Sequence, residues 1–151
     1  MEKPGKKVVL VFLHYHLNNF LLQLRDFKPD IVYPGCWGGF GGEIETGETP
    51  AQAGFREIRE ELGYRAFEMN YFQHYDNFDN LNIYVFYSQM NKPPEELCLT
   101  EGQEIGMFNA ENILSGSLVS KKYQKAFPVA TPLPSIFRDF LEYIGKGSGM
   151  K

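Results

Sequence analysis

One stretch of the chain, residues 42–64, restricts the fold more than any other because it specifies both ends of a helix. Thr49 is a residue type that caps helix N-termini, and Pro50 suits the first helical position. Gln52 completes a capping box with Thr49, in which each side chain bonds to the other residue's backbone. Gly63 is a typical residue just beyond a helix end. The stretch therefore predicts a helix that begins at Pro50 and ends before Gly63.

The predicted helix has an apolar stripe and an acidic face. The apolar residues at helical spacing, which we expect to face a core, are Ala51, Phe55, Ile58 and Leu62. Glu57, Glu60 and Glu61 lie on another face, at spacings that place like charges next to each other and destabilise the helix. They also lie toward its C-terminus, where the helix dipole disfavours anions.

A bound cation would remove both penalties, and Mg²⁺ characteristically joins a few carboxylates to substrate phosphates. The alternative is a solvated acidic face, in which the interleaved Arg56 and Arg59 reduce the repulsion through ordinary surface pairs.

The spacing of the whole stretch favours a functional interpretation. It comprises Gly42, five residues, Glu48, seven residues, Arg56-Glu57, Ile58, Arg59, Glu60-Glu61, Leu62, Gly63 and Tyr64. This pattern resembles the Nudix box, the signature of the Nudix (MutT-like) hydrolases. The last position, usually aliphatic in that family, is Tyr64, whose ring can still be buried. The family often has Pro-Gly-Gly where this chain has Phe40-Gly41-Gly42.

The resemblance implies an α+β protein with the Nudix fold, a mixed β-sheet sandwiched between α-helices. It also implies a pyrophosphohydrolase that cleaves a nucleoside diphosphate linked to another moiety by attack of water on phosphorus. Mg²⁺, or alternatively Mn²⁺, would be required. Nucleoside triphosphates, oxidised nucleotides and nucleotide-sugars are the substrate groups left open.

The same resemblance assigns roles to residues. Glu57, Glu60 and Glu61 would be metal ligands together with the carbonyl of Gly41. The catalytic set would consist of Glu48, Arg56, Glu60, Glu61 and Glu101. In that set Glu48 either binds metal through water or orients the helix, and Arg56 pairs with Glu48 or the loop. The general base is a box glutamate or one from the later segment 101–104, where we prefer Glu101 to Glu104.

Substrate contacts are expected from one cation and several aromatic rings. Arg25 is expected to bind a substrate phosphate, although a surface ion pair is an equally good interpretation. The rings considered for stacking on a base are Trp37, Phe40 and Phe108, with Tyr33 and Phe78. Most aromatic residues in such a chain pack in the core, which is the alternative for each of them.

The rest of the sequence predicts one domain over residues 1–144 and a flexible tail over residues 145–151. Strands are expected over residues 7–16, 20–25, 66–75 and 82–90, with an irregular loop over 26–36. A second loop is expected over 91–106, followed by a short strand at 107–108 and a short helix over 109–114. The stretch 115–134 is polar and contains prolines, and an amphipathic helix is predicted over 134–144.

Composition excludes several classes of protein. The net charge of −4 provides no basic surface for duplex nucleic acid, and the two cysteines are too few for a disulfide framework. The apolar run near the N-terminus is too short to span a membrane. We therefore expect a cytoplasmic protein that acts on a small nucleotide, with homodimerisation possible. The alternatives are a non-catalytic nucleotide-binding sensor module with a Nudix fold and an RNA-end hydrolase, the latter disfavoured by the negative charge.

Overall fold

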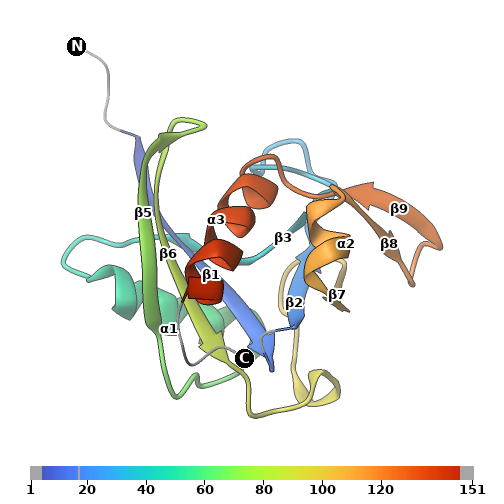
Figure 1. Cartoon of the computed structure of the whole chain (residues 1–151), viewed down its shortest axis with the longest axis horizontal. Coiled ribbons are helices and arrows are strands. Elements are labelled where there is room, and N and C mark those ends of the chain that lie inside the picture. Colours follow the sequence, from blue (N-terminus) through green and yellow to red (C-terminus); the bar gives the residue numbers. More distant parts are fainter. Residues whose placement is uncertain (1–4, 17, 147–151) are drawn as a thin grey trace. The chain divides into compact units, whose positions relative to one another are not determined.

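The structure is a computed structural model that describes residues 5–16 and 18–146. Figure 1 shows its helices and strands. Its contacts divide the chain into two compact units. The first unit comprises the chain up to His14 together with Gly39–Thr100. It contains all of the helix that was predicted to begin at Pro50 and end before Gly63. The second unit comprises Tyr15–Gly38 and the chain from Glu101 onward.

The first unit is built on a mixed sheet. Its strands are β1 (Lys6–Tyr15), β4 (Phe40–Glu43), β5 (Asn70–Phe78) and β6 (Leu81–Gln89). Strand β1 pairs parallel with β6 and antiparallel with β4, and β5 pairs antiparallel with β6. The β5–β6 turn contains Asp79 and Asn80 at φ 52° and 66°, the left-handed conformation that tight hairpins require. The short 3-10 helix η1 (Pro94–Glu96) follows β6.

Helix α1 (Pro50–Leu62) has the ends that the sequence predicts. The Thr49 Oγ1 accepts from the Gln52 N–H at 3.1 Å, and the Gln52 Oε1 accepts from the Thr49 N–H at 2.9 Å. Gly63 caps the C-terminus at φ 62°, a conformation that glycine adopts without steric cost. Tyr64 buries its ring, and its hydroxyl donates to Asn91 Oδ1 at 2.9 Å, so the unusual residue at this position is accommodated.

The apolar stripe predicted for α1 is partly wrong. Its buried residues are Ala53, Gly54, Ile58 and Leu62. Phe55 is 40% exposed, and Ala51 is only half-buried. A Cβ atom on Gly54 would lie 2.8 Å from the sulfur of Met69, so Met69 occupies the space that a side chain would need at this position. Because a glycine marks the contact face, hydrophobic periodicity placed that face incorrectly.

The second unit contains a small antiparallel sheet, a hairpin and two helices. Strand β2 (Asn19–Leu24) lies between β3 (Trp37–Gly38) and β7 (Glu104–Phe108). Strands β8 (Ser117–Ser120) and β9 (Lys125–Pro128) form the hairpin. Helix α2 (Ala110–Leu114) is short, and α3 (Pro132–Lys146) packs Phe137 edge-to-face on Phe20 with ring centroids 4.7 Å apart.

The α+β class with a mixed sheet is confirmed, but several predicted boundaries are wrong. The hairpin β8–β9 was missed because each strand is only four residues long and places two apolar residues next to each other, so no alternating pattern is present. Strand β5 begins at Asn70 rather than at residue 66, and β7 occupies the end of the predicted second loop. Gly145 and Lys146, expected in the tail, belong to α3. Residues 147–151 lie outside the described residues.

Within residues 5–16 and 18–146, no helix combines the length and the apolar character that crossing a membrane requires.

Candidate active site

Two of the box glutamates lie against consecutive glycines of β4. The Gly41 N–H donates to the Glu61 Oε2 at 3.0 Å. A Cβ atom on Gly42 would lie 2.7 Å from the carboxylate carbon of Glu57, so this carboxylate rests directly on the backbone of Gly42. Strand β4 thus holds the carboxylates of Glu57 and Glu61 side by side along one turn of α1.

Only glycine fits the backbone at position 41. Its φ is +150°, and a Cβ atom there would lie 1.9 Å from the carbonyl oxygen of Val9 on β1. This close approach of β4 to β1 is what brings the Gly41 N–H to Glu61. Gly41, just before the box, therefore serves the site through its backbone conformation, and Gly42, the first residue of the box, serves it through its missing side chain.

Arg56 joins the start of the box to the glutamates. Its Nε donates to Glu48 Oε2 at 2.7 Å and its Nη2 donates to Glu48 Oε1 at 3.0 Å, a bidentate pair. Nη2 also donates to the Glu43 carbonyl at 2.9 Å, and the Glu45 N–H donates to Glu48 Oε1 at 3.0 Å. The predicted pairing of Arg56 with Glu48 and with the loop is therefore confirmed. The hydrogen bond from Arg56 lowers the pKa of Glu48 to about 2.

The other terminal nitrogen of Arg56 contacts two more carboxylates. Nη1 donates to Glu57 Oε1 at 2.8 Å and to Glu60 Oε2 at 3.2 Å. The side chain of Glu57 is 15% exposed and that of Glu60 is 56% exposed. Burial raises the pKa of Glu57, and the hydrogen bond from Arg56 opposes this shift only in part. Glu57 is therefore a half-buried carboxylate whose charge is incompletely compensated.

The end of α1 is fixed by the segment that precedes residue 101. The Cys98 N–H donates to the Leu62 carbonyl and the Thr100 N–H to the Glu61 carbonyl, each at 3.0 Å. The Thr100 hydroxyl donates to the Glu60 carbonyl at 2.9 Å. These bonds satisfy carbonyls that a helix C-terminus leaves without partners, and they hold the backbone of Glu60 and Glu61 in place.

The donor set is chemically suited to a hard divalent cation. Within the described part of the chain, no three His, Cys, Asp or Glu side chains already converge on one point. However, the carboxylates of Glu57 and Glu61 contact consecutive glycines of β4, and burial penalises the charge of Glu57. A cation beside them would reverse that penalty, because an opposite charge favours the ionised form. Carboxylate oxygens are also the ligands that Mg²⁺ prefers.

The pairing of Glu48 predicts how stability depends on pH. Because the folded pKa is about 2 and the ordinary value 4.5, ionised Glu48 stabilises the fold above pH 4.5, and this contribution is lost as pH falls toward 2. We expect Glu48→Gln to lower the urea midpoint of unfolding at neutral pH. The difference in midpoint between this variant and the wild type should become smaller at about pH 3. Glu95→Gln, at an exposed glutamate of η1 in the same unit, is the matched control. A difference in midpoint that is the same at both pH values would show that the ionisation of Glu48 is not its cause.

The predicted substrate residues differ in how far they are exposed. Trp37 has no exposed surface and donates its indole N–H to the Leu118 carbonyl at 3.0 Å in the second unit. Phe40 is fully buried in β4 of the first unit. A ring without exposed surface cannot stack on a base, so the structure contradicts these two expectations. The burial of Phe40 shows instead that the residue replacing the family's common proline fills the core.

Arg25 and Phe108 keep some access to solvent. Both are half-buried in the second unit. The Arg25 Nε donates to the Val32 carbonyl at 2.6 Å, which fixes the guanidinium within the 26–36 loop. Phe108 packs edge-to-face on Trp37 with centroids 4.8 Å apart. Their roles toward substrate remain predictions.

The two glutamates of the 101–104 segment have different surroundings. Glu104 accepts hydrogen bonds from the Ser120 hydroxyl and from the Lys121 N–H, so it ties β7 to the end of β8. Glu101 is exposed and directly follows the anchored Thr100 in the chain. The preference for Glu101 as a candidate base agrees with this difference, because a carboxylate engaged in structural bonds is less available for proton transfer.

Two features of the first unit were not predicted from sequence. The first is the contact of Gly42 with Glu57, which follows from β4 packing on α1 and has no local sequence signal. The second is a pocket on the outward face of α1, lined by Gln52, Phe55, Arg56, Arg59, Arg65 and Ala66. The helical spacing of Gln52, Phe55 and Arg59 could have predicted this pocket from the sequence. It was not recognised because Phe55 was assigned to the core.

Comparison with known proteins agrees with the geometry of the box. The model of the NUDIX domain matches residues 5–124. The m7GpppN-mRNA hydrolase NUDT17 of Xenopus laevis is 34% identical over 71 residues, which are 47% of this chain and 24% of that protein. The chain thus matches about a quarter of the length of this curated relative.

Solved structures match over nearly the whole chain. A MutT protein from Methanosarcina mazei superposes with a TM-score of 0.70 at 19% identity, covering 95% of this chain and 97% of that one. A MutT/Nudix family protein from Listeria innocua gives 0.69 at 20% identity, covering 96% and 97%. At these identities the likeness shows the fold, and the family model covers most of the sequence. The chain therefore belongs to the NUDIX domain family, the family of the Nudix hydrolases.

Proposed function

We propose that this protein is a Mg²⁺-dependent pyrophosphohydrolase that cleaves a nucleoside diphosphate linked to another moiety. The observation that carries the proposal is the pair of box carboxylates, Glu57 and Glu61, held on the consecutive glycines of β4. The packing of apolar groups does not explain why two acidic side chains lie there. The burial of Glu57 also destabilises its charged form. A fold that tolerates this cost is typical of a functional site.

The residues have distinct roles in this proposal. Glu57, Glu60 and Glu61 would hold the cation together with the Gly41 carbonyl. When bound, Mg²⁺, or alternatively Mn²⁺, neutralises charge on the phosphoryl oxygens and lowers the pKa of a bound water. Arg56 keeps the helix and the loop before it in register through its bidentate bond to Glu48. Glu101 accepts the proton from the attacking water, which then bonds to phosphorus as the pyrophosphate bridge breaks.

Nucleoside triphosphates, oxidised nucleotides and nucleotide-sugars are the substrate groups that fit this chemistry. Capped RNA ends form a second candidate group, because the Xenopus relative is named as an m7GpppN-mRNA hydrolase. Its matching segment is short, so it supports a test of capped substrates rather than an assignment. A sensor module with the same fold is the non-catalytic alternative.

A phosphate-release screen tests the proposal. Purified protein is incubated with representatives of the substrate groups and with a capped dinucleotide, with and without Mg²⁺, using pyrophosphatase or phosphatase as the coupling enzyme. Hydrolysis that requires the metal would support the proposal and identify the substrate group. Tight binding of a nucleotide by folded protein, with no metal-dependent product from any substrate, would support the sensor module instead.

The two glutamates of the 101–104 segment should respond differently to substitution. We expect Glu101→Gln to lower kcat by roughly 100-fold with little change in Tm, the lower end of the effect of a general base. Glu104→Gln should lower Tm, because it weakens the bonds to Ser120 and Lys121. Steady-state kinetics and thermal melts of both variants check this. Full activity in Glu101→Gln would assign the base to a box glutamate.

The remaining expectations stay proposals. A small nucleotide is the proposed partner, a cytoplasmic location is supported by the two free cysteines, and a homodimer is possible. Light scattering coupled to size exclusion measures the oligomeric state directly.

A further inference from the structure

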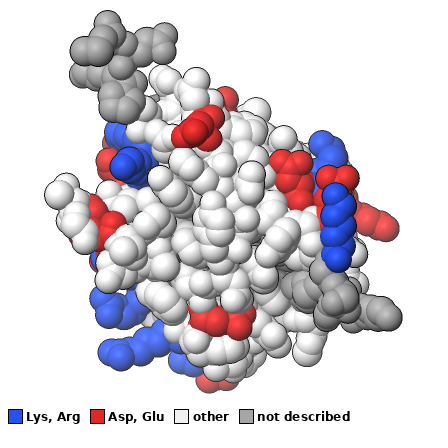
Figure 2. All heavy atoms as spheres, turned by 60° about the vertical axis from the view of Figure 1, so that its left-hand side comes forward, with Lys and Arg blue, Asp and Glu red and all other residues white. Residues whose placement is uncertain are grey.

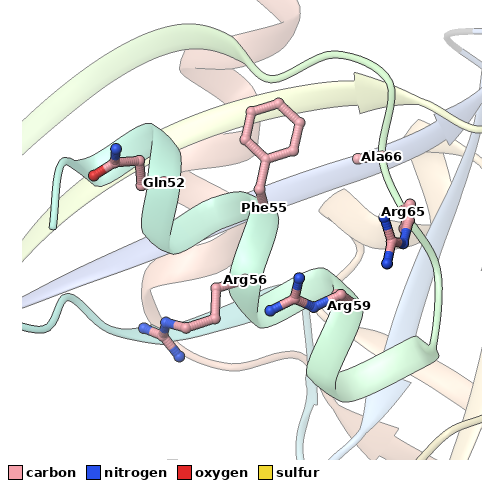
Figure 3. A pocket seen from close by; sticks show the side chains of 6 residues that line it. All are labelled: Gln52, Phe55, Arg56, Arg59, Arg65 and Ala66. Atoms are coloured by element: carbon pink, nitrogen blue, oxygen red, sulfur yellow. The ribbon is translucent and has the colours of Figure 1, made fainter.

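The outward face of α1 carries a pocket of about 370 Å³. Gln52, Phe55, Arg56 and Arg59 line it from the helix, at spacings that place them on one face. Figure 3 shows that Arg65 and Ala66 complete the lining from the segment that follows the helix. The volume lies within the range of small-molecule sites.

This pocket is separate from the carboxylates of the box. Glu57 and Glu61 point toward β4, where they contact Gly42 and Gly41. Arg56 is the one lining residue that also contacts the box glutamates, and its guanidinium is engaged there by Glu48 and Glu57. The pocket chemistry therefore depends on the other lining residues.

Two of these residues are cations without a counter-ion. Arg59 and Arg65 are exposed, and neither side chain makes an ion pair or a hydrogen bond within residues 5–16 and 18–146. This is notable in a chain of net charge −4. On the face drawn in Figure 2, Lys and Arg lie at the lower left, at the upper left and along the right edge, while much of the middle is uncharged. Both guanidinium groups line the same pocket, and like charges that share a pocket repel each other unless an anion lies between them.

The third element of the pocket is an exposed aromatic ring. Phe55 is 40% exposed, although its helix has a well-packed apolar face on Ile58 and Leu62. Figure 3 shows its ring projecting from α1 on the side of Arg65 and Ala66. An exposed ring beside guanidinium groups offers a stacking surface for a flat heterocycle, and guanidinium binds phosphate bidentately.

We propose that this pocket is an accessory site for a nucleoside phosphate, with the phosphate bound by Arg59 and Arg65 and the base stacked on Phe55. The amide of Gln52 supplies a hydrogen-bonding group on the same face. The ligand is either a free nucleotide or a nucleotide at the end of a single RNA strand, because both present the same phosphate and base. The site differs from the proposed metal centre in its chemistry, since it contains cations where the metal centre contains carboxylates.

An NMR titration of the metal-free, 151-residue chain tests this site. The probes are AMP, adenosine and inorganic phosphate, added in EDTA to uniformly ¹⁵N-labelled protein. We expect AMP to shift the amide signals of residues 52–59 and 65–66 to saturation, and adenosine and phosphate to bind at least about 10-fold more weakly. A 5′-phosphorylated RNA oligonucleotide and its unphosphorylated counterpart distinguish an RNA end from a free nucleotide.

Two variants and a control make the test specific. Arg59→Gln with Arg65→Gln should weaken AMP binding about 10-fold, and Phe55→Leu about 5-fold. Arg138→Gln is the matched control, because Arg138 is also an exposed helical arginine. Unchanged AMP affinity in the double variant would overturn the proposal. AMP-induced shifts confined to Gly41 and Gly42 would also overturn it, since they would place the nucleotide at the box.

Discussion

Glu61→Gln should lower kcat by at least about 1,000-fold while leaving the fold intact. Loss of an outer partner of a metal ligand already costs up to about 100-fold, so loss of a ligand itself should cost more. The fold should persist because the Gln side-chain oxygen can still accept the hydrogen bond from the Gly41 N–H. The substitution therefore removes the negative charge but retains the contact with β4. Turnover of the screened substrate and a thermal melt measure the two effects separately.

Glu95→Gln is the matched control for this experiment. Glu95 is an exposed glutamate of η1 in the same unit, away from the box. Its substitution makes the same change in net charge and should leave turnover at the wild-type level. A Glu61→Gln protein with near wild-type kcat would remove Glu61 from the metal site. A Glu61→Gln protein that fails to fold would show that the charge, rather than the contact, supports β4.

Local sequence signals predicted α1 well and predicted the sheets less well. Both ends of α1 follow from Thr49, Gln52 and Gly63, each of which acts on backbone groups within a few residues of itself. The face that α1 buries depends on Gly54 meeting Met69, a contact that spacing along the helix does not encode. The hairpin β8–β9 was missed for a similar reason, because its short strands gain their order from pairing with each other.

The candidate site could likewise be predicted from the sequence only in part. The acidic residues of the box and the Arg56–Glu48 pair could be predicted because they belong to one continuous motif. The fit of Glu57 on Gly42 could not, because it arises where β4 packs against α1. Aromatic residues were the least predictable. Trp37 and Phe40 are in the core and Phe55 is exposed, the reverse of what was expected, because the hydrophobicity of a ring does not distinguish packing from ligand stacking.

Substitutions at Gly41 and Gly42 should have different effects, one on the stability of the fold and the other on catalysis. Gly41→Ala should destabilise the protein by at least about 3 kcal/mol, because steric overlap and an unfavourable φ act together. The new Cβ would lie 1.9 Å from the Val9 carbonyl oxygen, and backbone atoms of β1 cannot move away without breaking its pairing with β4. Urea unfolding followed by circular dichroism measures this loss.

Gly42→Ala should instead preserve the fold and impair catalysis. Its Cβ would meet only the carboxylate of Glu57, at 2.7 Å, and that side-chain end can rotate away. We expect Tm to fall by only a few degrees, whereas kcat/KM should fall by about 100-fold, because a displacement of about 1 Å at a catalytic group can cost that much. Wild-type kcat/KM in Gly42→Ala would show that the position of Glu57 on β4 is not needed for turnover. Because the two substitutions add the same methyl group to neighbouring residues, any difference between them reports what each glycine contacts.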